Sequence, residues 1–181
     1  MNYWQGPKVR LRAMEPDDGD YFFHILQDVD IQRCEADLRL PMSLEACRAF
    51  AREQAAKGNN DPAPFLMIED SEGHRVGLAT PSMADERVGV FACGIHILPG
   101  YRRRGYAADA LRLILRYYFE ERRCVKFHAS VYSFNDASNA LCRHLGLAPE
   151  GCRRKVVYTG GAYYDELLWG LTDEEYFARL R

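Results

Sequence analysis

A basic turn that contains one glycine is the part of this chain best suited to chemistry. The run Tyr101-Arg102-Arg103-Arg104-Gly105-Tyr106-Ala107 follows the apolar stretch Ile95-His96-Ile97-Leu98 and precedes an amphipathic one. A helix that begins at such a turn attracts anions, because its first N–H groups have no intrahelical partner and its dipole adds positive potential. Gly105 lacks a Cβ and Ala107 is small, so a phosphate group could approach the backbone. The sequence predicts a phosphate-binding turn, and the alternative is a plain strand-to-helix turn with a solvated basic cluster.

A second polar cluster lies further along the chain, at the start of another expected helix. Asn135 precedes the segment Asp136–Leu145, Ser138 falls in its first turn, and Cys142 lies one turn later. Asparagine is a favoured N-cap residue, and a serine in a first turn is readily satisfied by the helix backbone. A structural role and a functional role are both open for these side chains.

Together the two segments resemble the GNAT N-acetyltransferases. Arg102, Gly105 and Ala107 match the family's pyrophosphate-binding motif, (Q/R)-x-x-G-x-(G/A). The segment from Asn135 to Gly151 is similar to the N-x-x-S…LGF-x-x-EG segment of the RimJ/RimL branch, through Asn135, Ser138, Leu145-Gly146-Leu147 and Glu150-Gly151. A weaker likeness extends from Val9 to Leu167.

The resemblance implies acetyl-CoA as cosubstrate and assigns its binding residues. The backbone amides of Arg103, Arg104, Gly105, Tyr106 and Ala107 would hold the pyrophosphate, with the side chains of Arg102, Arg103 and Arg104 secondary. The backbone of Ile95 and Ile97, on a splayed strand, would bond the pantetheine amides. Asn135 and Ser138 would also contact the coenzyme.

The catalytic residues are less well marked. Many GNAT members have a tyrosine, seven residues after the asparagine, that is proposed to protonate the departing thiolate; here that position is Cys142. The RimJ/RimL branch has a serine instead, which Ser138 matches, so we rank Ser138 above Cys142. His96 is a candidate general base because imidazole titrates near neutral pH, although a histidine between apolar residues is more often structural. Other acids and histidines qualify by type alone, and deprotonation through water remains open.

Two segments are expected to form the walls of the acceptor site, since the family places its walls there. The segment Asp28–Asp37 is locally acidic and would suit a cationic amine, although a solvated loop is the simpler interpretation. The other wall is the hairpin around Thr159-Gly160-Gly161, with aromatic residues at Tyr158, Tyr163 and Tyr164 that could be either core or wall.

The remaining patterns predict the elements that position these residues. Strands are expected at 8–13, 65–68, 74–80, 88–98 and 126–132, with helices starting near 15, at 44–57, at 105–122 and at 136–145, and a final hairpin at 156–158 and 164–171. This order agrees with what the resemblance implies, an α/β fold of the GNAT type, in which a mixed twisted sheet has helices on both faces. We expect a single GNAT domain over residues 1–181.

Composition narrows the function classes. The chain has 181 residues and a formal net charge of -2, so no overall basic field favours nucleic acid. No apolar run is long enough for a membrane span, and the six cysteines form no C-x-x-C pair and no metal-ligand spacing. We therefore expect a cytoplasmic protein with reduced thiols, no bound metal and no membrane contact.

The sequence thus predicts an acetyl-CoA-dependent N-acetyltransferase in which an amine attacks the thioester directly. The acceptor is left open between a protein N-terminus, a polyamine and another small amine, and a homodimer is left open too. The alternative is a non-catalytic acyl-CoA-binding sensor or partner module on the same fold, because the usual tyrosine is missing.

Overall fold

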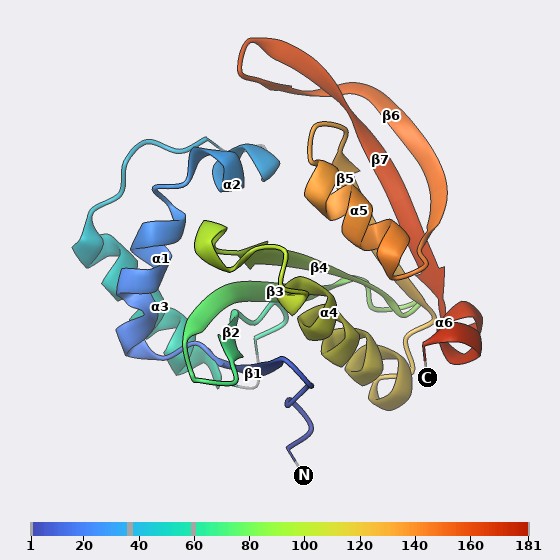
Figure 1. Cartoon of the computed structure of the whole chain (residues 1–181), viewed down its shortest axis with the longest axis horizontal. Helices are drawn as coiled ribbons and strands as arrows, with labels where there is room; N and C mark the ends of the chain where they lie inside the picture. Colours follow the sequence, from blue (N-terminus) through green and yellow to red (C-terminus); the bar gives the residue numbers. More distant parts are fainter. Residues whose placement is uncertain (1, 36–37, 59–60, 181) are drawn as a thin grey trace. The chain divides into compact units, whose positions relative to one another are not determined.

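A computed structural model describes residues 2–35, 38–58 and 61–180 (Figure 1). The chain divides into two compact units. Unit 1 comprises residues 1–82 and 94–113, and unit 2 comprises residues 83–93 and 114–181. Each unit is described by itself.

Seven strands form one mixed sheet in the order β1-β2-β3-β4-β5-β7-β6. The β1–β2, β2–β3, β5–β7 and β6–β7 pairs are antiparallel, whereas β4 and β5 run parallel. The β4–β5 pairing covers only Val90 with Lys126 and Phe91 with Phe127.

Unit 1 begins with β1 (Val9–Ala13), the 3-10 turn η1 (Pro16–Asp18) and three helices. These are α1 (Gly19–Ile25), α2 (Val29–Cys34) and α3 (Leu44–Lys57), followed by β2 (Leu66–Asp70) and β3 (Arg75–Asp85), whose residues from 83 onward belong to unit 2. The predicted cap of α3 is confirmed, because the Ser43 side chain accepts a hydrogen bond from the Ala46 amide. The helix ends at Lys57, as the following Gly58 indicated.

The core of unit 1 lies where α1 and α3 meet β2 and β3. Its buried residues include Met14, Tyr21, Ile25, Ala51, Met67 and Leu78. Phe22 and Phe50 stack with ring centroids 4.5 Å apart. An ion-pair network closes one side, where Arg12 bridges the buried carboxylates of Asp18 and Glu69.

Strand β4 (Val90–Ile97) leads through the 3-10 turn η3 (Pro99–Tyr101) and the basic turn into α4 (Tyr106–Arg116). We expected one α-helix to Arg122, but the last part is a π-helical segment, η4 (Tyr117–Glu121). The Arg122 amide bonds the Tyr117 carbonyl, five residues back, which is the π-type hydrogen bond. A hydrophobic stripe alone does not distinguish these two helix types.

Unit 2 is built on β5 (Lys126–Tyr132), α5 (Asp136–His144), the hairpin β6 (Ala148–Thr159) and β7 (Ala162–Thr172), and α6 (Asp173–Arg179). Its core is aromatic: Phe91 stacks on Tyr118 at 4.5 Å and lies 5.2 Å from the Phe127 ring. The predicted strand 126–132 has the observed bounds, whereas both hairpin strands are longer than expected.

Two helices were not predicted. The acidic segment was interpreted as a solvated loop or acceptor wall, but it contains α2, whose first amides at Asp30 and Ile31 bond the Asp28 carboxylate. The C-terminal α6 begins with a capping box in which Thr172 and Glu175 satisfy each other's backbone amides. The observed order of elements therefore has one more helix between β1 and β2 and one more at the end.

Candidate functional site

The basic turn in unit 1 has the backbone geometry of an anion site. Arg103 and Gly105 both have positive φ, at 63° and 83°. Within the described part of the chain, the amides of Gly105, Tyr106 and Ala107 donate to no acceptor. Because the first turn of α4 begins at Tyr106, these donors are the orphan N–H groups of a helix start. The turn therefore presents consecutive donors suited to phosphate oxygens.

The three arginines of the turn differ in what they contact. The Arg102 guanidinium donates to the Ile97 carbonyl at 3.0 Å and lies 3.4 Å from the Asp28 carboxylate. The Arg104 guanidinium donates to the Gly100 carbonyl at 3.2 Å and lies over the Tyr101 ring. Among the described residues, Arg103 is the arginine of this turn whose side chain has no such partner. Its positive charge remains available to a ligand.

His96 lies on β4 between the two isoleucines expected to bind pantetheine. Its Nε2 is 2.8 Å from Glu35 Oε1, at the C-cap of α2. Only 13% of the His96 side chain is exposed, against 42% of the Glu35 side chain. A carboxylate at this distance orients the imidazole ring. The sequence offered both residues as separate candidates by type and gave no signal that they would meet.

The acids of the segment Asp28–Asp37 are engaged rather than simply solvated. Asp28 caps α2 through one carboxylate oxygen and faces Arg102 through the other. Glu35 pairs with His96. Asp37 lies outside the described residues. Helix α2 is thus held at both ends by charged contacts with the residues of β4 and the basic turn.

Asn135 and Ser138 belong to unit 2, at the start of α5. The Asn135 side-chain oxygen accepts a hydrogen bond from the Ser138 amide at 3.1 Å, which is an N-cap. The cap uses the oxygen of Asn135, so its NH₂ group is not consumed by capping. Ser138 is partly exposed, and its hydroxyl has no recorded hydrogen bond within the described residues.

Cys142 and Asn139 lie on the buried side of the same helix. Burial raises the pKa of the Cys142 thiol to about 11, so this group is a neutral thiol at pH 7. Asn139 accepts a hydrogen bond from Trp169 Nε1 at 3.0 Å and donates to the carbonyls of Tyr132 and Asn135. We did not single out Asn139, although an amide on the buried face of a helix is itself an unusual signal.

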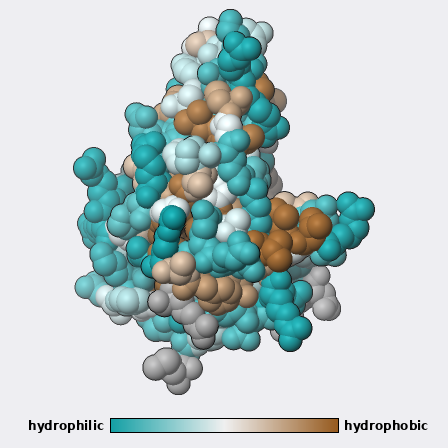
Figure 2. Space-filling model, turned by 90° about the vertical axis from the view of Figure 1, so that its right-hand side faces the viewer, coloured by the Kyte–Doolittle hydropathy of each residue, from teal (hydrophilic) through white to brown (hydrophobic). Residues whose placement is uncertain are grey.

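The hairpin tyrosines differ in exposure. Tyr158 and Tyr163 are 62% and 64% exposed, and their rings lie 4.9 Å apart across the strand pair. Tyr164 instead packs edge-on against Phe134. Figure 2 shows the hairpin tip at the top, where hydrophilic and weakly polar residues intermingle and no broad apolar patch lies. Two tyrosines are therefore surface residues, and the third belongs to the packing.

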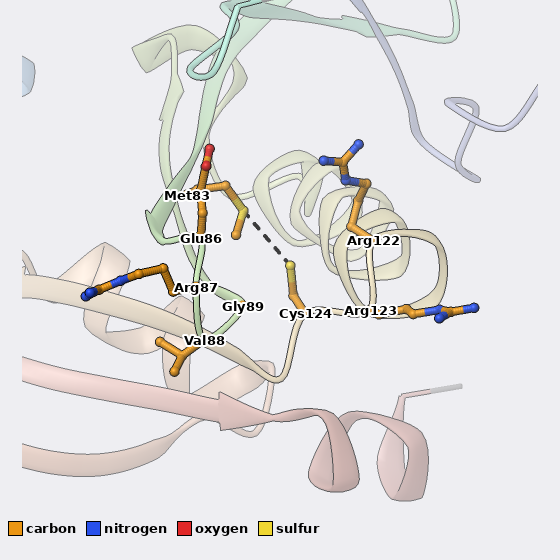
Figure 3. A pocket seen from close by; sticks show the side chains of 8 residues that line it. All are labelled: Met83, Glu86, Arg87, Val88, Gly89, Arg122, Arg123 and Cys124. Atoms are coloured by element: carbon orange, nitrogen blue, oxygen red, sulfur yellow. Dashed lines mark hydrogen bonds between the residues drawn. The ribbon is translucent and has the colours of Figure 1, made fainter.

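A separate pocket of about 480 Å³ lies in unit 2, between the turn after β3 and the turn after η4. At its centre the Cys124 thiol contacts the Met83 sulfur at 4.0 Å. Figure 3 shows the side chains of Arg87, Arg122 and Arg123 fanning away from these sulfur atoms. None of the predicted site residues lines this pocket.

The described residues contain no group of three or more His, Cys, Asp or Glu side chains placed to hold a metal ion. All six cysteines are free thiols. Among the helices of the described residues, none has the length and apolar content needed to cross a membrane.

The sequence pattern of the acetyltransferase (GNAT) domain matches residues 8–148. The chain belongs to the GNAT family. It is 34% identical over 176 residues to the SPbeta prophage-derived N-acetyltransferase YokL of Bacillus subtilis, covering 97% of this chain and 96% of that one. The N-acetyltransferase YnaD of the same organism is 30% identical over 78 residues, which cover 43% of this chain and 46% of that one.

Solved structures share the GNAT fold at lower identity. A spermidine N-acetyltransferase from Vibrio cholerae, in complex with CoA and spermine, has a TM-score of 0.80 at 18% identity, covering 93% of this chain and 98% of that one. The ribosomal L7/L12 alpha-N-protein acetyltransferase RimL, in complex with CoA, has a TM-score of 0.80 at 16% identity, covering 93% and 96%. The predicted fold class is confirmed, and this chain is an N-acetyltransferase that uses acetyl-CoA.

Proposed function

We propose that this GNAT enzyme acetylates a primary amine, with the coenzyme held by the turn Arg102–Ala107 and a proton accepted by His96. The observation that carries the proposal is the His96–Glu35 contact of 2.8 Å on β4, in the same unit as the open amides of the turn. A thioester-bearing cosubstrate supplies the electrophilic carbonyl. The remaining work falls to the protein: binding phosphate, orienting the acetyl group and removing a proton from the amine.

The residues of the turn fit the cosubstrate's anionic part. The amides of Gly105, Tyr106 and Ala107 offer consecutive donors, and Gly105 adopts the positive φ of the turn without the strain that a side chain would bring. Arg103 adds a charge whose side chain is not engaged within the described residues. Arg102 and Arg104 instead support the turn from within, through Ile97, Asp28 and Gly100.

The proton chemistry is assigned to His96 with Glu35 as its orienting partner. An amine is mostly protonated at pH 7 and attacks a carbonyl only as the neutral form, so a base near neutrality speeds the reaction. Glu35 fixes the imidazole ring and leaves the other nitrogen, Nδ1, to exchange a proton directly or through water. The acidic end of α2 also favours a cationic acceptor.

Ser138 is assigned the role of hydrogen-bonding the leaving thiolate, as the resemblance to the RimJ/RimL branch implies. The partly exposed hydroxyl of Ser138 is a better hydrogen-bond donor to a thiolate than the buried thiol of Cys142, whose pKa is about 11. Asn135 supports this assignment by capping the turn of α5 that carries Ser138. The coenzyme contacts of Ile95, Ile97 and Asn135 are part of the same proposal, as is a single domain over residues 1–181.

The acceptor classes we propose are a polyamine and a protein N-terminus, with another small amine as the third possibility in the test. A panel of spermidine, a short peptide with a free N-terminus and a simple alkylamine, with release of free thiol as the readout, distinguishes them. Salt-sensitive turnover of spermidine supports the acidic wall around α2. Preference for the peptide assigns acceptor recognition to the β6–β7 hairpin. If none of the amines leads to thiol release, a binding module is favoured.

The base assignment has its own test. His96→Gln should slow turnover by about 100-fold, a magnitude typical of a lost general base, with coenzyme affinity retained. Glu35→Gln should slow turnover by only several-fold, because it keeps a hydrogen-bond partner for the imidazole. Unchanged turnover in His96→Gln would assign the proton to water or to another residue.

A further inference from the structure

The segment that precedes β1 is joined to the basic turn by one lysine side chain. Lys8 Nζ donates to the carbonyl oxygen of Arg104 at 2.8 Å, across 96 residues of sequence. The same nitrogen would lie 2.8 Å from a Cβ built on Gly105. The ammonium group therefore lies directly against the Arg104–Gly105 peptide.

The backbone of Lys8 is fixed to the same helix start. One oxygen of the buried Asp109 carboxylate accepts the amides of Lys8 and Val9, at 2.8 and 2.9 Å. A Cβ on Gly6 would lie 2.5 Å from that oxygen, so the glycine lets the chain pass close to Asp109. Asp109 is in the first turn of α4. Its hydrogen bonds to the Lys8 and Val9 amides therefore hold the Lys8 backbone at a fixed place relative to the basic turn.

The contact determines which way one amide points. In a trans peptide the C=O and N–H groups point in opposite directions, and the described residues contain no cis peptide bond. With the Arg104 carbonyl held by Lys8, the Gly105 amide is directed away from Lys8. That amide is one of the three donors that have no acceptor among the described residues.

We propose that Lys8 is a positioning residue for acetyl-CoA, because its hydrogen bond to Arg104 holds the Gly105 amide toward the pyrophosphate. The inference rests on the proposed coenzyme site at Arg102–Ala107. A positioned donor costs no reorganisation when the ligand binds, so the contact acts on affinity. It makes no contribution to proton transfer, which occurs at His96.

Three substitutions at Lys8 separate positioning from charge. Lys8→Met removes the donor and keeps the aliphatic length; we expect KM for acetyl-CoA and Kd for CoA to rise about five- to tenfold, the value of one ordinary hydrogen bond, with kcat retained. Lys8→Arg keeps a charged donor and should restore most of the affinity. Lys8→Gln keeps a neutral donor and should fall between them.

The matched control is Lys57→Met, which removes the same charge from the exposed end of α3 in the same unit. It should leave CoA affinity unchanged. Dephospho-CoA, which lacks the 3′-phosphate, provides the second control, because a contact that acts at the pyrophosphate weakens both ligands by the same factor. Thermal unfolding of the ligand-free variants should match the wild type, since the Lys8 side chain is exposed.

Several results would overturn the proposal. An unchanged Kd in Lys8→Met does so, and so does a loss confined to CoA, which would mean that Lys8 binds the 3′-phosphate directly. Failure of Lys8→Arg to restore binding, or a lower unfolding temperature with lost kcat, would reduce Lys8 to a structural residue. Gly105→Glu separates failure of the Lys8 proposal from failure of the proposed coenzyme site. If Gly105→Glu abolishes binding while Lys8→Met does not, only the role of Lys8 fails. If neither variant affects binding, the coenzyme site itself is misplaced.

Discussion

Two helix starts, one in each unit, carry the residues that the sequence marked for coenzyme binding, and they use their backbone donors differently. At α4 the amides of Gly105, Tyr106 and Ala107 have no acceptor within the described chain. At α5 the Asn135 side chain caps the Ser138 amide. One turn later Asn139 bonds Trp169 and two backbone carbonyls. At the first helix start three consecutive amides have no acceptor, whereas at the second the Asn135 side chain occupies the Ser138 amide and leaves those of Asp136 and Ala137 without an acceptor among the described residues.

The difference shows that a motif match and a binding role are separate statements. Both segments match the GNAT pattern, and at the α4 turn three consecutive amides without an acceptor in the described chain suit an anion. At α5 Asn135 and Asn139 form hydrogen bonds within the protein, and the Ser138 hydroxyl carries the proposed role in turnover. Substitutions at α4 should therefore affect binding, and substitutions at α5 should mainly affect stability or turnover.

The largest effect is expected from Gly105→Glu. The new Cβ would lie 2.8 Å from Lys8 Nζ at a φ of +83°, so the substitution strains the turn, displaces Lys8 from the Arg104 carbonyl and adds a negative charge beside the helix start. We expect acetyl-CoA binding to weaken by at least about 100-fold, the order of two lost charge-assisted contacts, and the thermal stabilisation by saturating coenzyme to disappear. Calorimetric titration and melting curves measure both quantities.

The matched control is Gly73→Glu, in the turn between β2 and β3. Gly73 has the same φ of +83°, and a Cβ there would meet nothing within 4 Å. It reproduces the backbone strain and the added charge without approaching the basic turn. If both variants lose coenzyme binding equally, strain rather than the phosphate site explains the loss, and the contrast between the two helix starts fails.

At α5 the expected loss is in stability. Asn139→Ala removes three hydrogen bonds and leaves the buried Trp169 N–H unpaired, so the free energy of unfolding should fall by about 2–4 kcal/mol. Asn135→Ala removes an N-cap and should cost about 1 kcal/mol. Urea unfolding gives both values. A larger loss in Asn135→Ala would mean that the cap, rather than the Asn139 network, anchors this helix.

The sequence was most informative where the decisive interactions are local. The Ser43 cap and the end of α3 at Lys57 follow from capping and glycine rules, and the bounds of β5 follow from its apolar pattern. Helix α6 was not predicted, although its Thr172–Glu175 capping box is a local pattern that can be recognised in the sequence. The motif itself located the basic turn, because a strand, a glycine and a helix start are adjacent in sequence.

The contacts that could not be predicted join residues far apart in the chain. Periodicity places His96 on a strand and leaves Glu35 in an acidic segment, but only the fold of unit 1 brings them to 2.8 Å. The same holds for Lys8 with Arg104 and for Asn139 with Trp169. Each depends on how elements pack, and no spacing rule within one element carries that information.

Substitution of Ser138 and Cys142 tests the one catalytic role left at α5. Ser138→Ala should lower kcat by about tenfold, because a hydrogen bond to developing negative charge is lost, and should change coenzyme affinity little. Cys142→Ala should leave kcat within about twofold, since the Cys142 thiol is buried and a thiol is a weak hydrogen-bond donor. A larger loss of turnover in Cys142→Ala, with folding intact, would reverse this ranking.

The smallest effect is expected from the arginines of the basic turn, where it compares Arg103, whose side chain is not engaged, with Arg104, whose side chain is. Arg103→Ala should raise Kd for CoA about three- to fivefold at low salt, with the loss shrinking as salt screens an exposed charge. Arg104→Ala should cost less, because that guanidinium already contacts the Gly100 carbonyl and the Tyr101 ring. Titrations at two ionic strengths measure the difference. If Arg104→Ala is the more damaging variant and its loss is independent of salt, the turn is held mainly by its internal contacts, and binding depends on backbone shape more than on the charge that Arg103 leaves free.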